Sequence, residues 1–355
     1  MRATAYAHTN IALVKYWGKR DDGGRGLNLP AVGSLSLTLD RFGTETTVEL
    51  SATDHDDHLT LDGVPRTGPE LERMSAFLDV VRDLSPTNAK RELYATVTSR
   101  NDVPTAAGLA SSASAFCALA LAATRAFGLV LDECNLSILA RQGSGSAARS
   151  VYGGFVVMHR GQAEHGEDCF AEPVRSTLDV RLVVVRCGSG PKEVGSTSGM
   201  GHAQRTSPYF PAWVATHEQD LADARAALAT ADLQRLGEVM EHSTFKMHAT
   251  TFSSRPPFFY VTSTTMAALA AVRELRARGI GACPGSLTFA RKAGTFERHL
   301  RLQLDRFGAR SGHACVVSGS GAEGDAHTDG EGLVVGLPVG APIAGGGDRQ
   351  LRAGT

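Results

Sequence analysis

A stretch of small residues at 104–114 (P-T-A-A-G-L-A-S-S-A-S) leads directly into the most strongly predicted helix of the chain, over 110–127. That helix is rich in Ala and contains neither Pro nor Gly, which favours a long and largely buried helix. Small residues let the backbone approach a ligand closely, and the N–H groups at a helix start favour anions. The segment is neither a Walker loop nor a dinucleotide fingerprint. It predicts either a phosphate-binding loop or an ordinary small-residue helix start.

Two further segments carry the same kind of chemistry. Residues 141–150 (R-Q-G-S-G-S-A-A-R-S) combine Ser and Gly, which place several donors around an anion, with Arg149. A guanidinium group can hold a carboxylate or phosphate through two parallel hydrogen bonds. Residues 10–20 (N-I-A-L-V-K-Y-W-G-K-R) bring two lysines and an aromatic pair to the end of a predicted strand, which suits a polyanionic ligand. Each segment alone also fits a solvated turn, but together they favour a site for phosphorylated ligands.

The rest of the pattern predicts an α+β chain, with strands and helices mixed up to about residue 185 and mostly helices from 190 to 280. Residues 44–50 lead into an acidic, solvated turn at 54–58, which predicts a strand and hairpin. Asp132 is the expected cap of a helix over 134–142. The other expected helices are 70–84, 212–228, 232–242 and 264–278, and the other expected strands are 94–99, 155–158 and 180–185.

Composition excludes several classes of function. Lys and Arg number 36 against 37 Asp and Glu, so the chain lacks the positive field of a nucleic-acid-binding protein. No apolar run reaches the ~18 residues of a membrane span. The first ten residues lack the apolar segment of a signal peptide, so we expect a cytoplasmic protein. The six cysteines form no C-x-x-C pair, which indicates buried reduced thiols rather than a metal site or disulfides.

Taken together, the three segments resemble the GHMP kinase superfamily, and more narrowly the diphosphomevalonate decarboxylase family. The resemblance runs from residue 1 to about 280, and K-Y-W-G-K-R and G-S-G-S-A-x-R-S are its most specific strings. The matching stretches are 9–20, 101–113, 141–154, 192–200 (K-E-V-G-S-T-S-G-M), 207–213 (S-P-Y-F-P-A-W), 247–250 (M-H-A-T) and 256–260 (P-P-F-F-Y).

The resemblance implies a two-lobed GHMP-kinase fold, with a ribosomal S5-like first lobe and a ferredoxin-like α+β second lobe. We expect an N-terminal ATP-binding lobe over 1–187 and a C-terminal lobe over 188–330. The implied reaction uses ATP and Mg²⁺: the 3-hydroxyl of mevalonate 5-diphosphate is phosphorylated, and loss of phosphate and carbon dioxide then gives isopentenyl diphosphate. Members of the family act in the mevalonate pathway and are commonly homodimers.

The resemblance also assigns roles to individual residues. Lys15 and Arg149 are the implied catalytic residues, with Lys15 beside the reacting hydroxyl. No side chain is expected to hold a metal directly, since Mg²⁺ would bridge the phosphates. The implied ATP-binding residues are Pro104, Gly108, Ser111 and Ser112, and the implied substrate-binding residues are Tyr16, Lys19, Ser144, Ser146, Arg149, Ser196 and Thr197.

One departure from the family pattern leaves the activity open. The family usually carries Thr-hydrophobic-Asp-Ala-Gly-Pro-Asn where this chain has T-F-A-R-K-A-G-T at 288–295, so Ala290 or Lys292 stands at the place of the family's Asp. A milder departure is A-V-G-S at 31–34, where the family tends to have Asn-Ser-Ser. Three interpretations follow: a decarboxylase that uses another carboxylate, such as Asp305; a kinase or decarboxylase of a related mevalonate phosphate; or a homologue that only binds nucleotide and substrate.

The departure lies in an unusual region. Residues 281–355 contain 16 of the 39 glycines, so either this part has diverged or a shifted reading frame has replaced it. We expect a helix at 296–307, a short strand at 314–317 and a disordered tail at 331–355.

Overall fold

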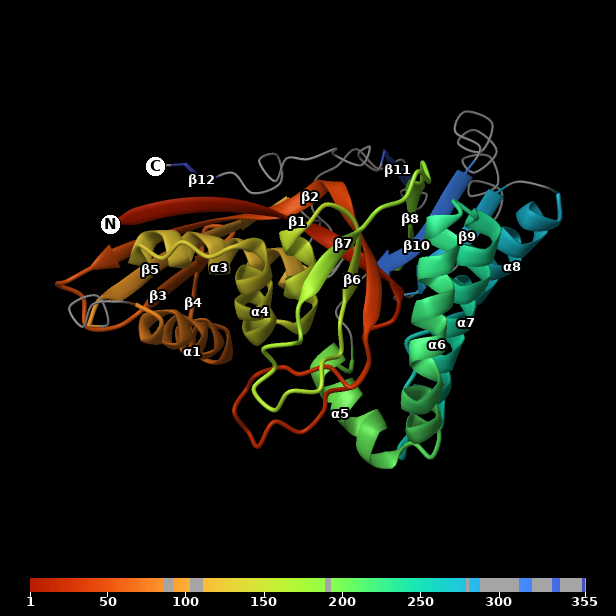
Figure 1. The fold of residues 1–355 in the computed structure, drawn as a ribbon, viewed down its shortest axis with the longest axis horizontal. Coiled ribbons are helices and arrows are strands. Elements are labelled where there is room, and N and C mark those ends of the chain that lie inside the picture. Colours follow the sequence, from red (N-terminus) through yellow and green to blue (C-terminus); the bar gives the residue numbers. More distant parts are fainter. Residues whose placement is uncertain are drawn as a thin grey trace.

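The computed structural model describes residues 1–85, 92–102, 111–188, 193–278, 281–287, 313–320, 334–338 and 353–354. These residues form two lobes that lie side by side, each with its own sheet (Figure 1). The predicted two-lobed α+β architecture is therefore confirmed. The predicted helix at 296–307 lies outside the described residues, as do Ala290, Lys292 and Asp305.

The first lobe contains an eight-stranded sheet with the order β12-β1-β2-β5-β3-β4, in which β6 pairs with β2 and β7 pairs with β6. Its two longest strands, β1 and β2, are antiparallel and reach from the first lobe toward the second (Figure 1). The strands of this sheet are β1 (Arg2–Val14), β2 (Ser34–Ser51), β3 (His58–Leu61), β4 (Val64–Arg66), β5 (Tyr94–Asn101), β6 (Gly154–Met158), β7 (Ala171–Val174) and β12 (Ala353–Gly354).

Three helices, α1 (Pro69–Asp83), α3 (Ser111–Phe127) and α4 (Glu133–Gly143), pack against this sheet. Their apolar sides join a buried cluster that includes Val48 and Val97 of the strands. Helix α3 is buried along most of its length, as its Ala-rich sequence predicts. The side chain of Asp132 accepts a hydrogen bond from the Asn135 N–H at 2.7 Å, which confirms it as the cap of α4.

The predicted hairpin after residues 44–50 is wrong. Strand β5 lies between β2 and β3, and β3 forms its hairpin with β4 instead. The turn at 54–58 is also less solvated than predicted, because Asp57 is buried and accepts hydrogen bonds from Arg82 and from the Ala95 N–H. The ion pair with Arg82 links the turn to α1, and the hydrogen bond from the Ala95 N–H links it to β5.

The second lobe contains a four-stranded sheet with the order β11-β8-β10-β9. Helices α6, α7 and α8 stand beside it, and α5 lies below the junction of the two lobes in the view of Figure 1. The elements of this lobe are β8 (Arg181–Gly188), β9 (Gly281–Leu287), β10 (His313–Ser320), β11 (Val334–Pro338), α5 (Ser196–Thr206), α6 (Phe210–Ala229), α7 (Leu233–Phe252) and α8 (Ser263–Ala277).

Helix α7 has 20 residues and ends at Phe252, ten residues beyond the predicted end at residue 242. Its second half carries buried hydroxyl groups, which interrupt the apolar pattern on which the prediction rested. The hydroxyls of Thr250 and Thr251 form hydrogen bonds within the helix, because they donate to the carbonyl oxygens of Met247 (2.7 Å) and His248 (3.0 Å). Polar residues that bond to their own helix can therefore be buried without ending it.

One of the apolar clusters contains residues of both lobes. Ile11 and Leu13 of β1 and Leu35 and Leu37 of β2 are buried in the same cluster as Leu221 and other residues of α6 and α7. Burial of apolar surface stabilises a fold by roughly 25 cal/mol per Å², so this cluster resists separation of the lobes. The lobes consequently hold their relative position through side-chain packing rather than through a linker alone.

The glycine-rich region contributes strands to both sheets. The predicted strand at 314–317 is confirmed as part of β10. Within 331–355, β11 pairs with β8 and β12 pairs with β1, so the expectation of a disordered tail does not hold for these two short segments. Their pairing satisfies backbone groups at the edges of both sheets. Among the described residues, no helix has the length and apolar character needed to cross a membrane.

Candidate active site

The end of β1 and the second small-residue loop lie against each other. The Asn10 side-chain amide donates to the Ser146 carbonyl oxygen at 3.0 Å and to the Ser150 Oγ at 2.8 Å, and both partners lie on the short 3₁₀ helix η1 (Gly145–Val151). Asn10 itself is buried. Two segments that are more than 130 residues apart in sequence are thus joined by a buried side chain, and the sequence analysis did not assign a role to Asn10.

Arg149 is the buried cation of this junction, with 2% of its surface exposed. Its guanidinium donates to Ser34 Oγ at 2.7 Å and to Asn10 Oδ1 at 3.2 and 3.3 Å. Within the described residues these partners are neutral. Burial lowers the pKa of Arg149 to about 10, while the nearby Tyr16 opposes this shift. The side chain therefore remains positively charged at neutral pH, and no carboxylate among these partners neutralises it.

Tyr16 lies beside this cation and presents a polar atom without a protein partner. The Arg149 guanidinium lies 5.9 Å from the Tyr16 ring centroid. Burial raises the pKa of the Tyr16 hydroxyl, so it stays protonated as a donor. This hydroxyl oxygen is buried and has no hydrogen-bond partner among the described residues. It is packed so closely on Gly145 that a Cβ there would overlap it. An orphaned buried hydroxyl of this kind indicates a place for a ligand.

Lys19 extends the positive surface. Its Nζ donates to Asn28 Oδ1 at 2.5 Å, and the Asn28 amide in turn donates to the Gln142 carbonyl oxygen at 2.6 Å. The pKa of Lys19 is lowered, first by burial and second by the charge of Arg73. The position of the lysine is thus set by an amide bridge to the end of α4, and the charge of Asp22 partly opposes the lowering of its pKa.

Arg73 is a further cation that the sequence analysis missed. It lies on α1, donates to the Gly143 carbonyl oxygen at 2.7 Å, and stacks 4.5 Å from the ring centroid of Phe116. Burial lowers its pKa. In the sequence Arg73 is one polar position of an ordinary amphipathic helix, and its residue as a whole is exposed like that of Glu72, so no local signal singles it out.

The hydroxyl groups of the two small-residue loops converge at the same place. Ser144 Oγ lies 3.4 Å from Ser112 Oγ and 3.3 Å from Ser146 Oγ. Ser111 and Ser112 are exposed on the first turn of α3, where N–H groups of the helix start are also presented. Pro104 and Gly108 lie outside the described residues. The structure therefore brings the beginning of the first loop's helix next to the second loop.

Lys15 is located on the same strand end but is held more tightly. It is 5% exposed, and its Nζ donates to the Ala12 carbonyl oxygen at 2.9 Å. Its backbone N–H donates to Ser243 Oγ of α7 at 3.1 Å. Lys15 therefore stands where the first lobe contacts the second, which is compatible with a place at the inner wall of the site.

Ser196 and Thr197 are the predicted substrate residues of the second lobe. Both are exposed on the first turn of α5. Farther along this helix, Gln204 Oε1 accepts a hydrogen bond from the Lys19 N–H at 3.3 Å. Helix α5 thus contacts the Lys19 segment through Gln204, and among the described residues neither Ser196 nor Thr197 forms a hydrogen bond with the other predicted site residues.

We call the group formed by Tyr16, Lys19, Arg73, Ser144, Ser146 and Arg149 the anion cradle. Its three cations and three hydroxyls come from the segment after β1, from α1, from Ser144 between α4 and η1, and from η1 itself. Charged donors in a partly buried site hold phosphate or carboxylate oxygens more strongly than they do in water. Within the described residues, no group of three or more His, Cys, Asp or Glu side chains is arranged to hold a metal ion.

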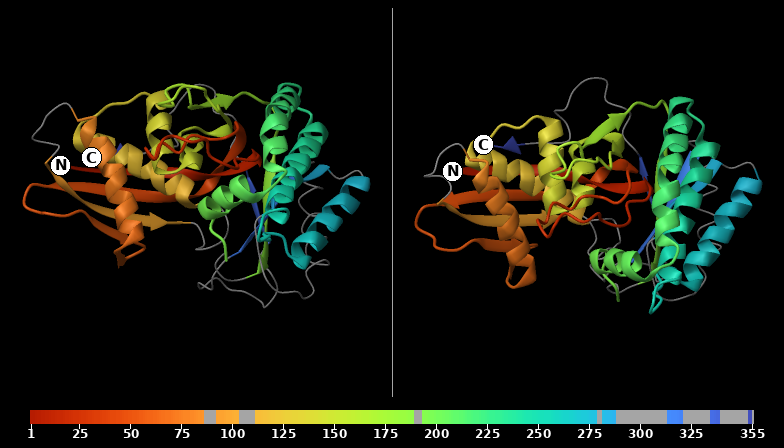
Figure 2. Two further views of the ribbon diagram at one scale, coloured as in Figure 1. Left: turned by 90° about the horizontal axis from the view of Figure 1, so that it is seen from below. Right: turned by 60° about the horizontal axis from the view of Figure 1, so that its bottom comes forward.

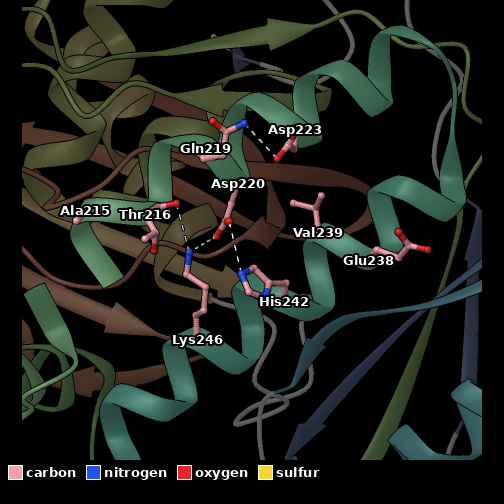
Figure 3. A pocket seen from close by; sticks show the side chains of 9 residues that line it. All are labelled: Ala215, Thr216, Gln219, Asp220, Asp223, Glu238, Val239, His242 and Lys246. Carbon is pink, nitrogen blue, oxygen red and sulfur yellow. Dashed lines mark hydrogen bonds and ion pairs between the residues drawn. The ribbon is translucent and has the colours of Figure 1, made fainter. Parts of the chain in front are cut away.

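A pocket of about 590 Å³ between α6 and α7 has a different character (Figure 3). Lys246 donates to Asp220 Oδ2 at 2.7 Å, and His242 lies 3.9 Å from the same carboxylate. Asp223 is paired with Arg235 at 2.9 Å. Because these charged groups already pair with one another, the geometry of this pocket does not indicate an anion site.

The two lobes, with a small-residue loop leading into a buried helix and an anion cradle at the junction, define a protein of the GHMP kinase class. Two family models narrow this class. The diphosphomevalonate decarboxylase-like N-terminal domain matches residues 7–171, and the mevalonate 5-diphosphate decarboxylase C-terminal domain matches residues 182–285. The chain belongs to the diphosphomevalonate decarboxylase family, as its sequence motifs predict.

Individual relatives agree with the family models. The chain is 36% identical to the diphosphomevalonate decarboxylase of Aspergillus fumigatus, over 81% of this chain and 74% of that protein. It is similar to the crystal structure of mevalonate diphosphate decarboxylase from Staphylococcus aureus, with a TM-score of 0.78 and 34% identity over 100% of this chain and 98% of the other. A structure described as MDDEF in complex with MVAPP, AMPPCP and magnesium matches with a TM-score of 0.74 and 35% identity, over 96% and 98% of the two chains. The predicted family, fold and enzyme class are confirmed.

Proposed function

We propose that this chain converts mevalonate 5-diphosphate to isopentenyl diphosphate with consumption of ATP, as an enzyme of the mevalonate pathway. One observation carries the assignment to this site: the buried guanidinium of Arg149 has neutral partners, and the buried hydroxyl of Tyr16 beside it has none among the described residues. A buried charge is costly unless an opposite charge or several hydrogen bonds compensate for it. An anionic substrate supplies that compensation, and it supplies an acceptor for the tyrosine hydroxyl.

The anion cradle divides into two parts along the substrate. Arg149 and the Tyr16 hydroxyl are adjacent and deeply placed, while Lys19 and Arg73 lie near each other at the C-terminal end of α4. The substrate has a carboxylate at one end and a diphosphate at the other, so two separate groups of cations suit its two charges. Ser144 and Ser146 add neutral donors between them.

Lys15 is proposed to face the 3-hydroxyl of the substrate. Its ammonium group is nearly buried at the inner wall of the site, where a positive charge would stabilise an alkoxide that forms as the hydroxyl attacks ATP. Catalysis of phosphoryl transfer depends mainly on positioning and on charge stabilisation. Arg149 and Lys15 are therefore the residues to which we assign the catalytic roles.

The nucleotide phosphates are proposed to bind at the start of α3. Ser111 and Ser112 are exposed there, and Ser112 lies beside Ser144 of the cradle, so a phosphate at the helix start is close to a substrate in the cradle. Gly108 and Pro104 would complete the loop. The complex of the relative with AMPPCP and magnesium confirms the expected ATP and Mg²⁺. Mg²⁺ neutralises phosphate charge, and it usually binds through phosphate oxygens and few protein groups.

The second lobe is proposed to close the site from the other side. Ser196 and Thr197 lie at the exposed first turn of α5, where their hydroxyls and the helix N–H groups suit a phosphate oxygen. We also propose a homodimer and a cytoplasmic location. The proposed lobes remain 1–187 and 188–330, although β8 (Arg181–Gly188) already pairs within the second sheet.

The other two interpretations differ in their products. Without an acid–base group at the family's Asp position, proton transfer loses the typical 10²–10⁴-fold contribution of general base catalysis. A kinase would then release ADP without carbon dioxide, and a binding protein would release neither. The relatives do not favour these alternatives, since they are decarboxylases.

The test is to incubate the purified protein with ATP, Mg²⁺ and mevalonate 5-diphosphate and to follow ADP and carbon dioxide together. Equal amounts of the two products are expected. Release of ADP without carbon dioxide would show that the protein is a kinase and not a decarboxylase. The absence of both products would leave only a binding function. Mevalonate 5-phosphate, tested in parallel, shows whether the diphosphate is required.

A further inference from the structure

Helix α6 touches the first lobe through two buried ring nitrogens that lie one helical turn apart. Trp213 Nε1 donates to the Trp17 carbonyl oxygen at 3.0 Å, and His217 Nε2 donates to the Gly33 carbonyl oxygen at 2.9 Å. The exposed fractions of Trp213 and His217 are 2% and 0%, and their rings are in edge contact with centroids 4.4 Å apart. One face of a second-lobe helix thus donates hydrogen bonds to two backbone carbonyl oxygens of the first lobe.

The contact on Gly33 is made from both sides of the residue. While its carbonyl oxygen accepts from His217, its N–H donates to Glu218 Oε1 at 3.0 Å. There is also little room around it, since a Cβ at this position would lie 2.7 Å from Leu221 Cδ2 and 3.2 Å from the Met158 carbonyl oxygen. Gly33 occupies a segment in which the family tends to carry polar residues. In this chain, His217 and Glu218 of α6 form hydrogen bonds with the backbone of that segment.

The two carbonyl groups that accept these hydrogen bonds belong to residues next to Tyr16 of the cradle and next to Ser34, a partner of Arg149. Trp17 follows Tyr16, and Gly33 precedes Ser34, whose Oγ accepts from the Arg149 guanidinium at 2.7 Å. Ser34 is fully buried, so the position of its hydroxyl is fixed once the position of its backbone is fixed. A shift of Gly33 would therefore move the Ser34 hydroxyl and, with it, the Arg149 side chain.

We propose that His217, with Glu218, is a positioning residue that holds the 33–34 backbone so that Arg149 faces the carboxylate end of the substrate. The inference rests on the proposed function, because it assigns Arg149 to the substrate side. His217 has no direct contact with the cradle side chains in the described structure, and it acts through Gly33 and Ser34. It makes the second lobe part of the substrate site without contributing a ligand.

The contact does not depend on a charge of the imidazole. A carbonyl oxygen only accepts hydrogen bonds, so Nε2 carries the hydrogen, and Nδ1 is buried without a partner among the described residues. Glutamine can place an amide N–H near the position of Nε2, whereas leucine fills a similar volume and has no donor. The pair His217→Gln and His217→Leu therefore separates the hydrogen bond from the packing.

The experiment measures steady-state kinetics with each substrate varied in turn. For His217→Leu we expect the KM for mevalonate 5-diphosphate to rise about tenfold, as follows from the loss of one buried hydrogen bond, while the KM for ATP changes less than twofold. His217→Gln should recover most of the loss. His242→Leu, a substitution of an exposed histidine on the neighbouring helix, is the matched control and should behave as the wild type.

Equal rises in both KM values, or identical behaviour of the Leu and Gln variants, would overturn the positioning role and leave a purely structural one. If His217→Leu does not fold, Glu218→Ala tests the same contact from an exposed position, and an unchanged KM for mevalonate 5-diphosphate in that variant would likewise overturn it. Wild-type protein that releases neither ADP nor carbon dioxide would contradict the proposed function. The His217 contact would then be tested by calorimetric binding of mevalonate 5-diphosphate, with the same ranking of variants expected.

Discussion

The anion cradle and the pocket between α6 and α7 both contain buried or half-buried cations, but they treat these charges differently. In the cradle, Arg149 is held by Asn10 and Ser34, which are neutral. In the pocket, Lys246 lies 2.7 Å from the carboxylate of Asp220 (Figure 3). The charge of a cation that is hydrogen-bonded to neutral groups is available to an anionic ligand. The charge of a cation in an ion pair is already compensated by the carboxylate. The two regions therefore differ in the partners of their cations, and not in whether they contain cations.

Arg141 provides a second contrast within the first lobe. It is fully buried like Arg149, and it lies eight positions before it in the sequence. Its guanidinium donates to the carbonyl oxygens of Leu27, Gly166 and Cys169. These bonds tie the segment around Leu27 to the segment around Gly166 and Cys169, and both segments belong to the first of the two lobes that lie side by side in Figure 2. Arg141 thus uses its donors for backbone structure, although both arginines belong to one predicted loop.

The largest expected effect follows from removing the cradle's buried charge. Arg149→Leu should lower kcat/KM for mevalonate 5-diphosphate at least about 10³-fold, since charged hydrogen bonds to a buried ligand are lost. ATP binding should stay within about threefold of the wild type, because the start of α3 is untouched. Nucleotide binding by calorimetry and turnover by ADP release measure the two quantities. Turnover within tenfold of the wild type would remove Arg149 from the site.

The second prediction concerns His217, which lies between the two regions and touches Gly33 on the cradle side. Burial is the main cause that lowers its pKa to about 4, and the charge of Lys246 lowers it further. The unfolded chain, with a histidine pKa near 6.5, binds a proton at a higher pH than the folded chain. Stability from the neutral imidazole is therefore complete above pH ~6.5 and is lost as the pH falls from ~6.5 to ~4, by up to about 3 kcal/mol.

This pH effect is measured by urea unfolding at several pH values, for the wild type and for His217→Gln. Both proteins lose stability in acid through their other titrating groups, so the informative quantity is the difference between the two curves. We expect the wild type to lose more stability than the variant over this pH range. Parallel curves would show that His217 does not titrate in this way.

The third prediction tests the paired cation. Lys246→Met removes the lysine partner of Asp220, a carboxylate with only 10% of its side chain exposed, and leaves it beside His242 at 3.9 Å. The poorer compensation of this buried charge should lower the free energy of unfolding by about 2 kcal/mol. The KM values should not change, since Lys246 is not part of the cradle. A marked loss of substrate affinity with unchanged stability would reverse the distinction between the two regions.

The smallest expected effect concerns the cation that the sequence analysis missed. Arg73→Gln should raise the KM for mevalonate 5-diphosphate about tenfold, because one of two neighbouring cations is lost from the diphosphate end. Arg66→Gln is a suitable control, as this arginine forms an exposed i,i+4 pair with Glu70 outside the cradle. Equal kinetics of Arg73→Gln and the wild type would restrict the cradle to Lys19 at this end.

Much of the first lobe follows from local patterns in the sequence. The Ala-rich composition of 110–127, without Pro or Gly, and the cap at Asp132 predict α3 and α4 correctly, because helix formation depends on neighbouring residues and on the groups at its ends. The prediction failed where distant groups decided the outcome. Strand β5 lies between β2 and β3, and the buried hydroxyls of Thr250 and Thr251 donate to carbonyl oxygens of their own helix α7, which continues past residue 242.

The sequence by itself determined the kind of chemistry: small-residue loops, a lysine-rich strand end and Arg149, in strings specific enough to indicate the family. Only the tertiary structure decided which cations stay unneutralised. Asn10 and Arg73 enter the site, and Arg141 leaves it, through contacts between residues far apart in the chain. The physical reason is that residue type sets which bonds a side chain can form, whereas packing sets which partner it meets.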